Sequence, residues 1–90
     1  MNKESAQAFL TPTTNGVLVS IKIEVGRQSM SIFSKHLSGY QIMSCSPSAL
    51  STLLTTTLDE LLTEIPLTKL SETLRQQSKQ SFVKLIESCL

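Results

Sequence analysis

Large aromatic residues are almost missing from this chain: it has no tryptophan, and one tyrosine and three phenylalanines supply its 4% aromatic content. Aromatic side chains therefore cannot fill most of a hydrophobic core, which must rest on Leu, Ile and Val. Ninety residues suffice for one domain. A chain of this length buries only about 60–65% of its unfolded surface, and small cores of this kind are often completed by a second subunit. We therefore expect a homodimer.

Charge is also scarce, because charged residues make up 17% of the chain and the formal net charge is +1. A protein that holds nucleic acid mainly by neutralising phosphates needs a basic field, so this class is disfavoured, although a local basic patch is still compatible. The sequence shows neither a charged leader followed by an apolar segment nor an apolar run near 18 residues. These absences predict a soluble, cytoplasmic protein without a membrane segment.

Side chains suited to catalysis or metal binding are few. His36 is the only histidine, and no serine lies in a Gly-x-Ser-x-Gly motif, so we expect His36 to be an exposed turn residue. Cys45 and Cys89 share no ligand spacing with it, and free buried thiols are favoured over a single long-range disulfide. Glu60 and Glu64 share one side of a predicted helix, which we interpret as a solvated face. We predict no enzyme activity, no metal and no cofactor.

A strand is predicted from residue 17, where apolar and polar residues alternate up to residue 25 with many β-branched side chains. Gly26 begins a turn, and residues 28–34 alternate again, which predicts a β-hairpin. Residues 40–45 have the length and composition of a third strand. Together these segments predict a three-stranded antiparallel sheet with one apolar face that needs a cover.

The first fifteen residues are polar and end in a run of turn formers at 11–16. We predict a flexible N-terminal arm at 1–15 and a single domain at 16–90. One turn of helix or a short edge strand are the alternatives for this arm. A further alternative is an arm exchanged between two subunits and anchored by Phe9 and Leu10.

The cover is a helix predicted at 47–65, because leucines recur there at i, i+3, i+4, i+7 and i+8 opposite Thr, Asp and Glu. Ser46 is a suitable N-cap, and Pro66 ends the segment. A second helix follows from Thr68 or Ser71 to the end of the chain. Its middle is polar all round, so two shorter helices are the alternative, but one continuous helix is favoured.

These elements define an α+β fold, with a three-stranded antiparallel sheet followed by two C-terminal helices. If the N-terminus were helical, the order would resemble the αβββα topology of double-stranded RNA-binding domains, in which the helix after the third strand carries a basic cluster. The corresponding helix here has Asp59, Glu60 and Glu64 and neither lysine nor arginine. The resemblance is therefore one of topology and does not imply RNA binding.

The last helix has more apolar residues than packing against a sheet requires, and exposed apolar stripes mark sites for partners. We therefore predict a small non-enzymatic interaction protein that binds and modulates or inhibits a partner protein as a dimer, as accessory proteins of phages and mobile elements do. The predicted partner-binding residues are Leu67, Leu70, Leu74, Phe82, Val83, Leu85 and Ile86.

The alternative is a nucleic-acid-binding regulator that uses basic residues of the hairpin and of the last helix. This function requires those side chains to converge on one face of the fold. The candidate contacts are Lys22, Arg27, Lys35, Arg75 and Lys79.

Overall fold

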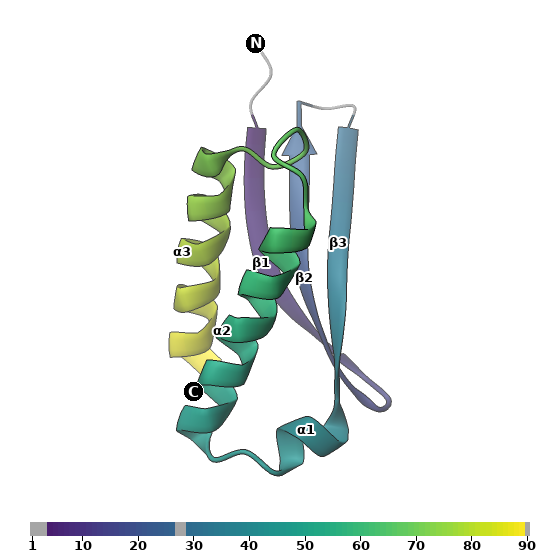
Figure 1. Cartoon of the computed structure of the whole chain (residues 1–90), viewed down its shortest axis with the longest axis vertical. Helices are drawn as coiled ribbons and strands as arrows, with labels where there is room; N and C mark the ends of the chain where they lie inside the picture. The colour runs from purple at the N-terminus through teal and green to yellow at the C-terminus, as the bar shows by residue number, and fades with distance from the viewer. Residues whose placement is uncertain (1–3, 27–28, 90) are drawn as a thin grey trace.

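A computed structural model gives the architecture and describes residues 4–26 and 29–89. Three antiparallel strands form a sheet in the order β1-β2-β3, and the helices pack on one of its faces (Figure 1). The α+β class, with a three-stranded antiparallel sheet followed by helices, is confirmed. The elements are β1 (Glu4–Thr13), β2 (Gly16–Val25), β3 (Ser29–Ser38), α1 (Gly39–Met43), α2 (Pro47–Glu64) and α3 (Glu72–Cys89).

The N-terminal segment corrects the predicted flexible arm at 1–15, because β1 pairs with β2 along its whole length. The domain therefore begins within this segment and not at residue 16. Ala6 and Ala8 lie opposite Ile23 and Ile21 and are buried on the helix side of the sheet. Alanine adds little to a hydrophobic alternation, which is why the sequence pattern is weak. Since residues 4–13 form a strand, the topological likeness to double-stranded RNA-binding domains does not hold.

The third strand is also assigned differently, since β3 continues to Ser38 and the segment expected to be a strand at 40–45 begins with helix α1. A capping box starts this helix: the Ser38 hydroxyl accepts from the Gln41 amide, and the Gln41 side chain accepts from the Ser38 amide. Both bonds turn the chain out of the sheet at Ser38. The hairpin predicted between β2 and β3 is present, and Gly26 at its turn has a φ of 64°.

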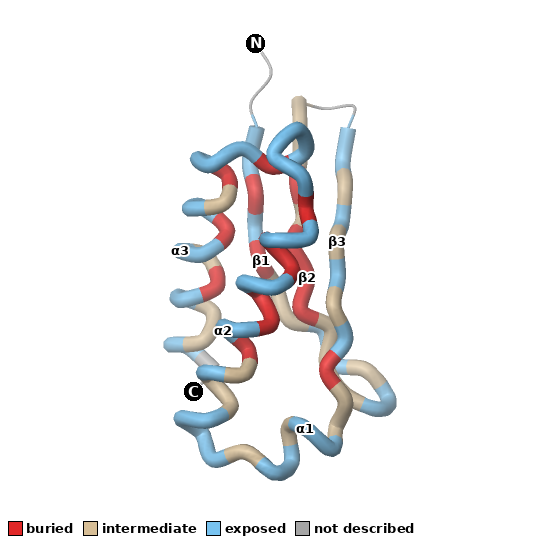
Figure 2. Tube along the Cα trace, viewed as in Figure 1, coloured by how far each residue is buried: buried red, intermediate tan, exposed pale blue. Residues whose placement is uncertain are grey.

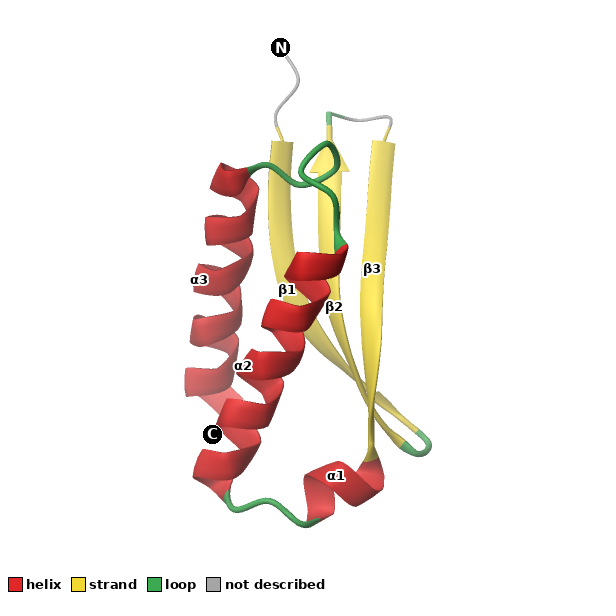
Figure 3. Cartoon of the chain, in the orientation of Figure 1, coloured by secondary structure: helices red, strands yellow, loops and turns green. Residues whose placement is uncertain are grey.

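The core lies between the central strand and the two long helices. Val19, Ile21 and Ile23 of β2 point to the helix side and are buried. Their neighbours along β2 point to the other face, which no helix covers in the described structure (Figure 3). Gly16 at the start of β2 is required by close packing, because a Cβ there would lie 1.9 Å from the carbonyl oxygen of Leu37.

Helix α2 agrees with the sequence prediction at both ends. The Ser46 hydroxyl accepts a hydrogen bond from the Ala49 amide, and Pro47 occupies the first turn. The leucine face is buried against the sheet, as the red segments of Figure 2 show. The buried members of this helix are Leu54, Thr57, Leu58, Leu61 and Leu62.

Helix α3 is one continuous helix, as favoured from the sequence, and it packs along β1. Its polar middle does not interrupt the buried stripe, because Ser78 is fully buried between Leu74 and Phe82. The Ser78 hydroxyl donates to the Leu74 carbonyl at 2.9 Å, so this buried polar group has a partner inside its own helix. The small side chain lets α3 approach the sheet closely.

Candidate functional site

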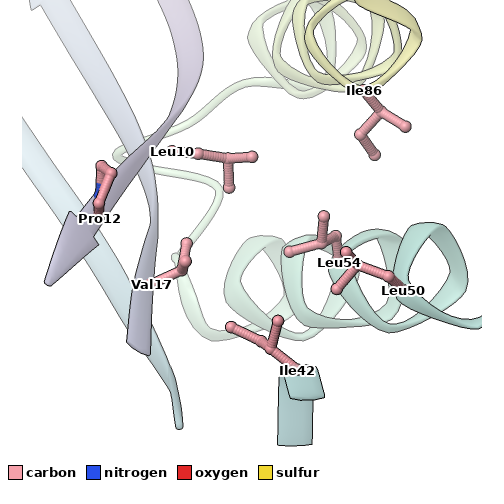
Figure 4. Close-up of a pocket in the computed structure, with 7 residues that line it drawn as sticks. All are labelled: Leu10, Pro12, Val17, Ile42, Leu50, Leu54 and Ile86. Carbon is pink, nitrogen blue, oxygen red and sulfur yellow. The ribbon is translucent and has the colours of Figure 1, made fainter. Parts of the chain in front are cut away.

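The candidate site is an apolar pocket of about 320 Å³ at the end of the molecule where the β1–β2 hairpin, α1, the start of α2 and the end of α3 meet (Figure 4). Two of the elements that bound it are held by local signals described above, which are the capping box of α1 and the N-cap of α2. The lining residues are Leu10, Pro12, Val17, Ile42, Leu50, Leu54 and Ile86.

The lining is aliphatic throughout, with no side chain that donates or accepts a hydrogen bond. Binding sites for small molecules usually combine apolar walls with a few polar groups that orient the ligand. This pocket has the walls without the orienting side chains, so it offers burial of apolar surface and no acid, base or nucleophile. Its lining is therefore suited to the binding of an apolar group.

Two large apolar side chains flank Ile42 on α1. Tyr40 is 89% exposed and Met43 is 86% exposed, the highest values among the large hydrophobic residues of the described chain. Both belong to the same five-residue helix as the lining residue Ile42, although neither lines the pocket. We call the pocket together with these two exposed side chains of α1 the end surface.

The residues predicted to bind a partner through the last helix do not form one exposed stripe. Leu70, Leu74 and Phe82 are 0%, 4% and 1% exposed, so they belong to the core and are not available at the surface. Leu67 and Val83 are exposed, at 63% and 52%. Leu85 and Ile86 are half-buried against the core, and Ile86 alone of the predicted set lines the pocket.

The rest of the pocket was missed because it takes residues from segments interpreted separately. Leu50 and Leu54 belong to the leucine face that we expected to close the sheet completely. Ile42 was placed in a strand, and Leu10 in the arm. The capping signal from Ser38 to Gln41 is the one feature of the sequence that identifies α1, and with it the position of Ile42.

The basic residues considered for nucleic-acid binding do not converge in the described structure. Lys22 lies on the face of the sheet away from the helices and pairs with Glu24 at 2.9 Å. Lys35 lies on the helix side, where its ammonium is 2.9 Å from Glu64 and 3.5 Å from Glu60. These two lysines therefore face opposite directions. Arg27 lies outside the described residues.

Glu60 and Glu64 are exposed, as predicted for a solvated helix face, and Lys35 pairs with both of them there. A hydrogen bond from its ammonium to Glu64 raises the pKa of Lys35 above the ordinary 10.5, while partial desolvation acts in the opposite direction. The negative charges of Glu64 and Glu60 add to the increase. The lysine therefore joins β3 to α2 and is not free to meet a phosphate.

Arg75 and Lys79 line a groove of about 290 Å³ between α2 and α3, together with Asp59 and Glu72. Two positive and two negative side chains leave this groove without net charge. The Arg75 guanidinium donates to the carbonyl oxygens of Leu62 and of the residue that caps α2 at its C-terminal end. Its position is thus explained by helix capping.

His36 lies in β3 and not in a turn, which corrects the sequence prediction, although it is exposed as expected. Its Nε2 is 3.2 Å from the Thr13 hydroxyl on the open face of the sheet. Cys45 is a free thiol, half-buried and not fully buried, and the side chain of Cys89 lies outside the described residues. Within residues 4–26 and 29–89, no three His, Cys, Asp or Glu side chains are grouped to hold a metal ion.

Of the helices in the described part of the chain, none has the length and hydropathy needed to span a membrane. Comparison with protein-family models, with curated proteins and with solved structures found no match to this chain.

Proposed function

We propose that this protein is a non-enzymatic binding protein that modulates or inhibits a partner protein, acts as a dimer, and receives an apolar side chain of that partner in the end pocket. The observation that supports the proposal is the end surface: an aliphatic pocket and, on the helix α1 that bounds it, the exposed side chains of Tyr40 and Met43. Exposed apolar surface next to a pocket is typical of sites at which one protein anchors on another.

The size of the pocket fits such an anchor. An apolar cavity of about 150 Å³ in a protein core accommodates benzene. A pocket of about 320 Å³ therefore has room for one large side chain such as Leu, Phe or Trp with its neighbouring backbone. Burial of such a side chain contributes about 1.5–3 kcal/mol.

The surface around the pocket favours a protein over a free small molecule. Tyr40 and Met43 are exposed apolar side chains of α1 that do not line the pocket, so a small ligand bound in the pocket would not cover them. Met is flexible and polarisable and is common on surfaces that adapt to protein partners, and Tyr is enriched in such interfaces. The half-buried free thiol of Cys45 is compatible with the cytoplasm, where thiols stay reduced, and we propose that compartment.

The nucleic-acid alternative remains a second proposal with less support. Lys35 is paired with two glutamates, and Arg75 donates to main-chain carbonyls. Its test is retention of the protein on immobilised DNA and RNA over a range of salt concentrations. A steep loss of retention between low and moderate salt would favour it over protein binding.

The experiment for the main proposal compares two glutamate substitutions at exposed apolar positions. Met43→Glu places a charge on the end surface, while Leu67→Glu places one at an exposed position outside the pocket lining, before α3. Each protein and the wild type are immobilised, exposed to lysate of the native cells, and the retained proteins are quantified by mass spectrometry. Circular dichroism first establishes that both variants fold.

We expect at least one protein retained equally by the wild type and by Leu67→Glu and reduced about tenfold or more by Met43→Glu, because a charge in an apolar contact is desolvated without a partner. Equal retention by all three would contradict the assignment of the end surface. A protein lost only from Leu67→Glu would move the binding site to the exposed residues of the chain before α3.

A further inference from the structure

The two edges of the sheet differ. On the outer edge of β1, side chains of α3 take the place of a neighbouring strand: the Ala6 amide donates to Gln77 at 3.4 Å, and the Ala8 amide donates to Ser81 at 3.3 Å. Ser81 also donates to the Ala8 carbonyl at 3.4 Å. Figure 1 shows α3 beside β1, whereas along the upper part of β3 no further element of the described residues lies beyond the strand, and only the β1–β2 hairpin crosses at its lower end. One edge is therefore closed by a helix, and the other is open.

The direction of the β1 amides fixes that of the β3 amides. The main-chain amides of Ala6 and Ala8 point away from β2. In an antiparallel pair, the main-chain N–H and C=O groups of their partners Ile23 and Ile21 therefore point away from β1 and bond to β3. Ser31 and Phe33 lie opposite those two residues and therefore bond inward. The alternation places the main-chain N–H and C=O groups of the even-numbered residues on the open edge. These residues are Met30, Ile32, Ser34 and His36.

This open edge lacks the features that usually prevent strands from pairing. The strand is ten residues long and contains neither a proline nor a carboxylate, and its register with β2 runs without a bulge. Lys35, its one lysine, is engaged by Glu60 and Glu64. Met30 and Ile32 are 59% and 52% exposed on the face away from the helices. An edge of this kind is a template for a further strand.

We propose that β3 pairs antiparallel with β3 of a second copy of this chain, about a two-fold axis at Ile32, to form a six-stranded sheet across the dimer. Ile32 then lies opposite Ile32 of the other subunit, and Met30 of each subunit lies diagonal to Ile32 of the other. The exposed apolar residues of the edge therefore meet. Lys35 lies opposite Ser29 of the other subunit, and no like charges face each other.

Charge favours a second copy over an unrelated strand. The strand carries no unpaired formal charge in its middle that would need a complementary partner, and its own sequence satisfies the pairing. An axis at Ser34 would instead place Ile32 opposite His36 and separate the apolar residues. This inference rests on the dimeric part of the proposed function and names its surface, while the end pocket stays free for a partner protein.

The test uses three substitutions at two positions of equal exposure. Ile32→Lys and Ile32→Glu each place two like charges opposite one another at the proposed axis, about 5.5 Å apart between Cα atoms. Val83→Lys is the matched control, because Val83 is also 52% exposed but lies on α3. Masses are measured by light scattering, with circular dichroism to establish folding.

We expect the wild type and Val83→Lys to have twice the 9.9 kDa chain mass. Each Ile32 variant alone should dimerise at least about tenfold more weakly, since like charges directly opposite destabilise strand pairs. An equimolar mixture of Ile32→Lys and Ile32→Glu should recover the dimer, because Lys then faces Glu across the axis.

The outcomes separate this inference from the proposed function. If Ile32→Lys and Ile32→Glu are as dimeric as Val83→Lys, the β3 edge is not the interface, although the protein is still a dimer. Monomeric mixtures would overturn the axis at Ile32. A wild-type monomer would overturn the dimer together with this inference, without touching partner binding at Met43.

Discussion

Ser81 of α3 holds both main-chain polar groups of Ala8 in β1, accepting a hydrogen bond from the amide at 3.3 Å and donating one to the carbonyl at 3.4 Å. A helix side chain thus replaces the strand that would otherwise lie beside β1. Buried main-chain groups almost always have partners, so this contact explains why α3 lies at the sheet edge. It also explains the asymmetry on which the proposed dimer depends.

The first prediction concerns this edge. Removing both helix side chains with Gln77→Ala and Ser81→Ala leaves the Ala6 and Ala8 amides without partners and should lower the free energy of unfolding by about 1–3 kcal/mol. Urea denaturation measures the change. The matched control replaces the exposed residues Gln76 and Gln80 by alanine and should change little. Equal effects of the two pairs would mean that α3 does not close the edge through these bonds.

The second prediction concerns Arg75, whose guanidinium donates to the Leu62 and Ile65 carbonyls at the end of α2. Arg75→Lys keeps the charge but loses the planar pair of donors. We expect a loss of about 1.5–3 kcal/mol in the free energy of unfolding, measured by chemical denaturation. The reciprocal exchange Lys79→Arg, one turn along the helix, should be nearly neutral. A neutral Arg75→Lys would show that charge alone suffices at this position.

The third prediction is a dependence on pH. The folded state raises the pKa of Lys35 above 10.5, so folding favours the charged lysine. The stability from this group is therefore fully present below pH 10.5 and is lost as pH rises through the higher folded pKa. Unfolding free energies measured between neutral and strongly alkaline pH should fall less steeply for Lys35→Met than for the wild type. Lys84→Met, at an exposed position, should keep the wild-type slope, and parallel curves for Lys35→Met and wild type would contradict the coupling.

The fourth prediction separates core from surface in the last helix. Phe82 is 1% exposed and its neighbour Val83 is 52% exposed. Phe82→Ala should destabilise the protein by about 3–5 kcal/mol through loss of burial and formation of a cavity. Val83→Ala should change stability by less than about 0.5 kcal/mol. Thermal and urea unfolding of the two variants measure this contrast. A loss of stability in Phe82→Ala as small as that in Val83→Ala would contradict the burial of Phe82 in the core.

Local signals in the sequence identify most of the elements. Helix α2 follows from the Ser46 cap, the proline after it and the leucine spacing, because these act within a few residues. The β2–β3 hairpin follows from alternation around Gly26. Helix α1 was misassigned because Tyr, Ile and Met at 40–43 suit a strand, while the deciding interaction is the pair of hydrogen bonds between Ser38 and Gln41.

Features that depend on distant residues could not be read in this way. Ala6 and Ala8 are small because α3 packs close to β1, which the strand alone does not reveal. The same contact buries Leu74 and Phe82, so the apolar excess of the last helix belongs to the core. The end pocket takes residues from five elements, and its existence depends on how the short helix α1 leaves the sheet.

The most direct test of the proposed dimer is amide hydrogen exchange, monitored by NMR at two protein concentrations. The Ile32 and Ser34 amides lie on the open edge of β3 and in the proposed dimer interface, while the Ala8 amide lies on the closed edge. We predict that Ala8 is protected at both concentrations, and that Ile32 and Ser34 exchange slowly at the high concentration and quickly at the low one. Equally rapid exchange of Ile32 and Ser34 at both concentrations would contradict the pairing of β3 with a second copy.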